Sequence, residues 1–187
     1  MASENKMGTM PEGRLIVTIS FPIMLSMLVQ ALYNIVDSAF VARISEDALT
    51  AVSLAFPVQL LMIAVATGTG VGVNALLSRR LGQKKQEEAN AVAANGVFLS
   101  VCFWLVFAVL GLLFGRSFIA LFTDVPAVID MGTSYVTVVT VASCGVFLLF
   151  VAERLMQATG NTVYHMVTQL IGAVLNCILD PIMIFGL

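Results

Sequence analysis

Residues 15–41 read LIVTISFPIMLSMLVQALYNIVDSAFV, an apolar run with one charged residue, Asp37. A transmembrane helix needs roughly 20 consecutive apolar residues, so this run is long enough to cross a bilayer. A cleavable signal peptide has a shorter apolar core, followed by small residues at its cleavage site. The run therefore predicts a permanent first transmembrane helix.

Four further apolar runs follow, and the breaks between them hold nearly all of the charged residues. The runs cover residues 51–77, 91–114, 131–150 and 163–187. They are too long for the strands of a membrane β-barrel, and they show no alternation of polar and apolar residues. We therefore predict an all-α, polytopic transmembrane bundle over residues 15–187, preceded by a short segment, residues 1–14.

The composition excludes several other classes of protein. Of the 187 residues, 59% are hydrophobic and 11% are charged, whereas a soluble domain has about 25% charged residues. The same composition excludes a disordered chain, and a net charge of -2 argues against a nucleic-acid partner. The three cysteines lie inside apolar runs without a CxxC pair, so we expect no cofactor and no cysteine-bound metal.

The distribution of Lys and Arg predicts the orientation in the membrane. Cytoplasmic loops are enriched in basic residues, and seven of the nine lie on one set of loops. These seven are Lys6, Arg14, Arg79, Arg80, Lys84, Lys85 and Arg154, against Arg43 and Arg116 on the other side. We expect a cytoplasmic N-terminus and a location in the inner or plasma membrane. Because residues 182–187 are apolar to the last, we also expect a fragment of a longer polytopic protein.

Two acidic residues, Asp37 and Asp180, lie within the apolar runs. A carboxylate at that depth costs on the order of 3 kcal/mol, and such residues usually face a wet cavity or a partner. Asp37 lies about 9 Å before Arg43, and Asp180 about 25 Å beyond Val163, at 1.5 Å per helical residue. Both estimates place a carboxylate in the outer third of the membrane, where the two acids can share one cavity.

Polar neighbours share a helix face with each acid. They are Gln30, Tyr33 and Asn34 on the first run, at i, i+3 and i+4 spacing, and Asn176 on the fifth. Carboxylate and amide oxygens suit a hard cation such as Na⁺, or a site that takes up a proton. The alternative is that these groups only bond helices together, which we favour for Gln30 or Asn34 taken alone.

Other motifs carry less weight. An intramembrane aspartyl protease would need a Tyr-Asp pair and a Gly-x-Gly-Asp motif, but Asp37 follows Val36 and Asp180 follows Leu179. We therefore do not expect an enzyme. The segment from Gly68 to Gly72 has no lysine for a nucleotide, and we expect it to let another helix approach closely.

Several pieces of the sequence together resemble the multidrug and toxic compound extrusion (MATE) family, in whose order and spacing they occur. They are Pro22, Gln30-Ala31-Leu32-Tyr33-Asn34-Ile35-Val36-Asp37, the glycine segment 66–74, Ser78-Arg79-Arg80-Leu81-Gly82, Gln157-Ala158-Thr159-Gly160-Asn161-Thr162 and Asn176-Cys177-Ile178-Leu179-Asp180-Pro181. The resemblance implies a twelve-helix transporter of two six-helix lobes. It would export cationic or amphipathic compounds in exchange for Na⁺ or H⁺. This chain would then hold about five helices of the N-terminal lobe, and its missing partner would be the C-terminal lobe.

The resemblance also implies roles for single residues. Asp37, Asn176 and Asp180 match the family's cation site, and any bound metal ion would be Na⁺ at these three residues. Gln30, Tyr33, Asn34 and Tyr135 fall on the side that faces the substrate cavity, and Pro22 matches a proline around which the first helix is proposed to bend.

Two other functions remain open at this stage. One is a flippase for lipid intermediates with a related architecture, although anionic lipid phosphates would call for Arg or Lys inside the cavity. The other is a membrane fragment or accessory protein that does not transport and packs against another subunit.

Overall fold

The computed structural model describes residues 10–41, 45–160 and 162–185, and the regular structure in these ranges is α-helical. The helices are α2 (Glu12–Val41), α3 (Glu46–Gly82), α4 (Gln86–Ala120), α5 (Pro126–Ala142), α6 (Cys144–Ala158) and α7 (Thr162–Phe185). Within these ranges four helices are long and apolar enough to cross a membrane, and the bent pair of α5 and α6 passes the same test when it is taken as one span. The predicted all-α membrane fold is confirmed.

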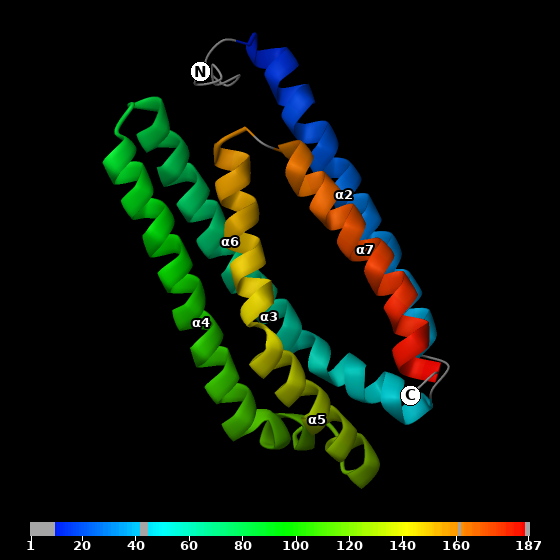
Figure 1. Ribbon diagram of the computed structural model, residues 1–187. Helices are drawn as coiled ribbons and strands as arrows, with labels where there is room; N and C mark the ends of the chain where they lie inside the picture. Colours follow the sequence, from blue (N-terminus) through cyan, green and yellow to red (C-terminus); the bar gives the residue numbers. More distant parts are fainter. Residues whose placement is uncertain (1–9, 42–44, 161, 186–187) are drawn as a thin grey trace.

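The spans alternate in direction, as Figure 1 shows. Helices α2, α4 and α7 start at the same end of the bundle, and α3 and the α5–α6 pair run back toward that end. Helix α3 packs against α4, α5 and α6, and α4 also contacts α5 and α6. Helices α2 and α7 pack against each other, while α7 also contacts α6 and α2 only touches α3. The bundle thus consists of an α3–α6 body and an α2–α7 pair.

The core of the body lies where α3, α4 and α6 meet. Met62 and Ala66 are buried there against Phe107 and Phe147, whose ring centroids lie 5.7 Å apart. Large apolar side chains such as Phe98 are exposed on the outside of the bundle. Because lipid tails are as apolar as these side chains, such a surface is stable in a bilayer but not in water.

The fourth run is not the single helix that residues 131–150 predict. It begins at Pro126, ends at Ala158 and bends by 44° between α5 and α6. The bend frees backbone carbonyls, and two side chains bond carbonyls beside it. The Ser143 hydroxyl donates to the Thr140 carbonyl at 2.7 Å, and Trp104 Nε1 on α4 donates to the Val141 carbonyl at 2.9 Å.

The longer fourth span corrects the place of its charged residues. Glu153 and Arg154, which the sequence puts in a loop, lie inside α6. The helix continues past Phe150 because residues 151–159 hold no Gly or Pro, and Gly160, with a positive φ of 81°, follows its end.

The glycines of α3 differ in their described contacts. No described atom lies within 4 Å of a Cβ built at Gly68 or Gly72, so no described helix makes the expected close approach to that pair, and the approach stays a prediction. A neighbouring glycine does make a close approach. A Cβ on Gly70 would lie 2.8 Å from Arg154 Cγ of α6.

Candidate functional site

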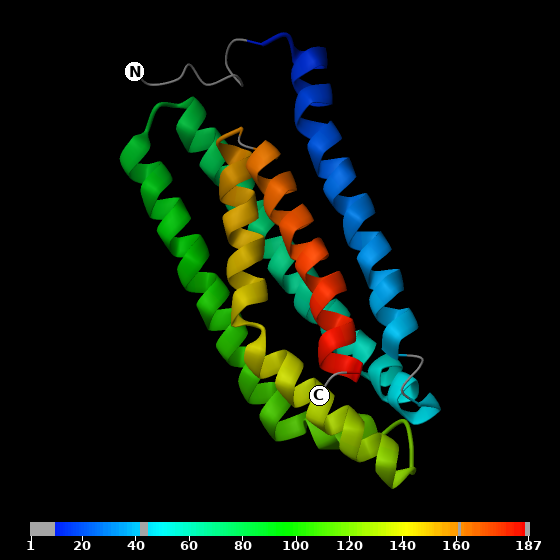
Figure 2. The ribbon, with the colours of Figure 1, turned by 45° about the vertical axis from the view of Figure 1, so that its right-hand side comes forward.

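The α2–α7 pair brings together the two helices that carry the intramembrane acids. The two helices run in the same direction, side by side, so their C-terminal ends lie at the same end of the bundle (Figures 1 and 2). Asp37 lies one helical turn before the end of α2 at Val41, and Asp180 a little more than one turn before Phe185. Their backbone positions are therefore at similar depth. Their side chains lie outside the described residues.

The other polar residues of the predicted site lie on unbroken helix. Gln30 and Tyr33 are half-buried on α2, and Asn34 is exposed. Because α2 is helical from Glu12 to Val41, the predicted spacing puts these residues on the same face as Asp37.

Asn176 carries the clearest sign of a binding role. It is half-buried on α7, one turn before Asp180, and its Oδ1 atom is buried without a hydrogen-bond partner. Among the described side chains it is the one oxygen in that state. Leaving a buried acceptor unpaired costs about 1–3 kcal/mol, whereas a bound cation or a donor would satisfy it. The atom is thus a candidate ligand beside the two acids.

Tyr135 has its described contacts elsewhere. It lies on α5, where its hydroxyl oxygen accepts a hydrogen bond from Gln59 Nε2 of α3 at 3.0 Å. It also packs against the cluster of Ala55, Ile119 and Val136. These contacts belong to the α3–α5 packing, and they do not join Tyr135 to the α2–α7 pair.

Pro22 is buried inside α2, and the helix continues through it. Proline has no N–H, so the Thr18 carbonyl loses its helical donor. One turn further on, the Ser26 hydroxyl donates to the Pro22 carbonyl at 2.9 Å. The helix is thereby weakened at one turn, which is the local property that a hinge requires; bending itself stays a prediction.

A second polar cluster was missed by the sequence reasoning. Glu153 of α6 is only 5% exposed and accepts a hydrogen bond from Gln169 Nε2 of α7. Beside it, Arg154 Nη1 donates to Gln157 Oε1 at 2.7 Å, and Asn74 Nδ2 of α3 donates to the Arg154 carbonyl at 3.1 Å. The cluster therefore ties α3, α6 and α7 together.

The sequence does hold a signal for this cluster. The buried positions Phe147, Val151 and Ala158 of α6 are spaced by four and seven residues. This spacing is typical of a helix. When it is extended beyond residue 150, where the apolar run ends, it predicts a helix that includes Glu153 and Arg154. Gln169 precedes Asp180 by about three helical turns, or about 16 Å, so the cluster lies at another level from the acids.

Comparison with known proteins gives a consistent picture. A family model described as MatE matches residues 22–182. A protein named FAD transporter from Shewanella oneidensis is 27% identical over 95% of this chain and 39% of its own length. The multidrug export protein MepA from Staphylococcus haemolyticus is 28% identical over 90% of this chain and 37% of its own length. The chain thus spans less than two fifths of either relative.

A solved structure extends the likeness to three dimensions. It is described as the outward-facing conformation of a multidrug resistance MATE family transporter of the MOP superfamily. It superposes with a TM-score of 0.86 and 29% identity, over 92% of this chain and 38% of that one.

Proposed function

The chain belongs to the MatE family of multidrug and toxic compound extrusion proteins, and on this premise we propose that it forms one lobe of a secondary transporter. The transporter exports cationic or amphipathic organic compounds across the cell membrane in exchange for Na⁺ or H⁺. The MepA relative, named a multidrug export protein, supports export as the activity. A second lobe completes the cavity, in keeping with the part of each relative that this chain spans.

The coupling ion binds at Asp37, Asn176 and Asp180 in this proposal. The observation that carries it is the unpartnered Oδ1 atom of Asn176, on the helix that packs beside α2 and one turn before Asp180. Two carboxylates and an amide oxygen form a hard donor set that suits Na⁺. Protonation of a carboxylate is the alternative, because it removes a charge that is costly inside a membrane.

Export then requires that the ion and the organic cation favour opposite arrangements of the transporter. A ligand shifts a two-state equilibrium only by its differential affinity for the two states. An organic cation and a small ion that neutralise the same carboxylates compete, so binding of one releases the other. Gln30, Tyr33 and Asn34 line the cavity on the cargo side, and Tyr135 joins them from α5. Bending of α2 at Pro22 accompanies the change between arrangements.

The charge of the described side chains favours cationic cargo. An anionic lipid intermediate or nucleotide would call for basic residues in the cavity. Arg154, which lies inside α6, contacts Gln157 on its own helix and lies against Gly70 of α3. The basic residues near the starts of α2 and α4 and the end of α3 gather at the end of the bundle that we assign to the cytoplasm.

The test substitutes Asp37→Asn in the full-length protein and measures efflux of an organic cation from energised membrane vesicles. We expect export driven by an ion gradient to disappear, because the amide has no charge to neutralise, while the amount of inserted protein stays the same. Asp130→Asn is the matched control, since Asp130 is exposed and pairs with Arg116 at 2.8 Å on the surface. Unchanged efflux in the Asp37→Asn protein would count against the mechanism.

A further inference from the structure

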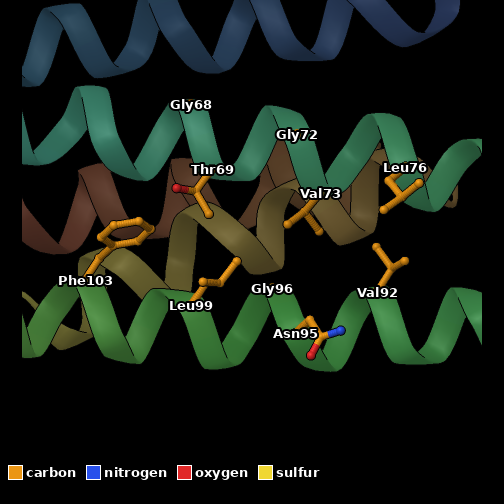
Figure 3. Close-up of a pocket in the computed structure, with 10 residues that line it drawn as sticks. All are labelled: Gly68, Thr69, Gly72, Val73, Leu76, Val92, Asn95, Gly96, Leu99 and Phe103. Carbon is orange, nitrogen blue, oxygen red and sulfur yellow. The ribbon is translucent and has the colours of Figure 1, made fainter.

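A groove lies between α3 and α4, and its lining residues belong to these two helices alone. It has a volume of about 410 Å³. Figure 3 shows Val73 and Leu76 of α3 directed toward Val92 and Leu99 of α4 across it. The groove exists because Gly68 and Gly72 have no side chain, and nothing described fills the space beside them. Leu76 and Leu99 are exposed, so no described helix closes the groove over these two side chains.

The groove leads toward the hairpin that joins the two helices. On α3 the face that carries Gly72 and Leu76 continues, three and four residues later, to Arg79 and Arg80. The segment 79–88 holds four basic and two acidic residues. An apolar groove thus ends at a site with an excess of positive charge, at the level where a long span leaves the hydrocarbon.

Ion pairs account for only part of that charge. Glu88 pairs with both Arg80, at 3.0 Å, and Lys85, at 2.7 Å. Arg79 and Lys84 are exposed and form no ion pair within the described residues. These two side chains are available to an anion at the end of the groove.

Lys84 has a left-handed backbone conformation, which residues other than glycine seldom adopt. Its φ is 60°, and its N–H donates to the Leu81 carbonyl at 3.0 Å while the Lys85 N–H donates to the Arg80 carbonyl at 3.0 Å. This pair of bonds is the Schellman ending of a helix, in which the left-handed residue is usually Gly, because any other residue except Asn is strained there. A lysine at this point gives up stability, and strained residues tend to be kept where they serve a function.

We propose that the α3–α4 groove binds an anionic phospholipid, with an acyl chain between Gly72 and Leu99 and the headgroup phosphate at Arg79 and Lys84. The complementarity of charge selects an acidic lipid over a zwitterionic one, and basic pockets beside transmembrane helices bind such headgroups. The site is independent of the acids of α2 and α7, so it stands whether or not the proposed cation site does.

Native mass spectrometry of the delipidated full-length protein tests the site, with phosphatidylglycerol and phosphatidylcholine as probes. We expect preferential retention of phosphatidylglycerol, and about fivefold weaker binding in Lys84→Gly or Arg79→Ala. Glycine fits the left-handed turn, so Lys84→Gly leaves the melting temperature unchanged or higher. Arg14→Ala is the matched control, an exposed arginine at the same end of the bundle on α2, and it leaves binding unchanged.

A second variant tests the groove itself. Gly72→Leu fills it without a clash, because a Cβ there meets nothing within 4 Å, and we expect it to lower retention of phosphatidylglycerol. Equal retention of the two lipids, or an equal loss of binding in Arg14→Ala, would overturn the proposal. Full displacement of the lipid by inorganic phosphate would also overturn it, because the hairpin alone would then account for the binding.

Discussion

At the scale of single residues, Asn176 is the residue whose surroundings favour a binding role over a role in stability. Its unpartnered Oδ1 atom costs free energy in a protein that has no ion to fill the site. An apolar side chain of similar size would remove that cost. The arrangement is therefore unfavourable for folding alone, and it makes sense if a ligand pairs with the oxygen.

The first prediction concerns the substitution Asn176→Leu in the full-length protein. We expect a melting temperature equal to or above that of the wild type without the coupling ion, and loss of the increase that Na⁺ or lowered pH gives. Thermal unfolding in detergent, with and without the ion, measures both effects. Asn90→Leu is the control, because Asn90 is exposed and bonded within α4. A lower melting temperature for Asn176→Leu, with the ion response intact, would show that Asn176 only supports packing.

The sequence predicts these residues unequally well. An acid within an apolar run is easy to find, because its cost in a membrane leaves few explanations other than function. Glu153 was missed because Arg154 follows it directly, and a pair of opposite charges after an apolar run is typical of a loop. This pair accepts hydrogen bonds from Asn74 and Gln169, which belong to two other helices. A single run of sequence cannot show such partners.

At the scale of elements, apolar length predicted the spans, whereas contacts between helices determine their shape. Trp104 reaches from α4 and donates to the Val141 carbonyl beside the bend between α5 and α6. Close packing beside the bend depends on Gly111 of α4, where a Cβ would lie 2.0 Å from Thr140 Oγ1 and 2.7 Å from Thr140 Cβ. Neither contact leaves a periodic signal in the sequence.

The second prediction compares two glycines near the bend. Gly111→Ala forces α4 and α5 apart, because Thr140 cannot turn its Cβ away, and we expect a loss of about 1–3 kcal/mol in stability. Gly145→Ala, in open space on α6, is expected to be neutral or slightly stabilising. Unfolding of the two variants in detergent, followed by circular dichroism, compares them. Equal stability would mean that α4 and α5 are not packed as closely as described.

At the scale of the whole molecule, the α2–α7 pair carries the proposed ion site and the α3–α6 body supports it. The pair contacts the body mainly where α7 packs against α6, and α2 makes only a small contact with α3. Because it has few contacts with the body, the α2–α7 pair can move relative to the body more easily than the helices of the body can move relative to one another. The sequence predicted the similar depth of the two acids from helix counting. It could not show that their helices are neighbours, because that depends on the path of the chain around α3.

The central claim is that ion and organic cation compete for one site. The most direct measurement adds an organic cation to the purified full-length protein and records release of bound ²²Na⁺ and of protons. The account predicts release of one of these ions in proportion to the organic cation bound, and none in the Asp37→Asn protein. Binding of the organic cation without release of either ion from the wild type would contradict it.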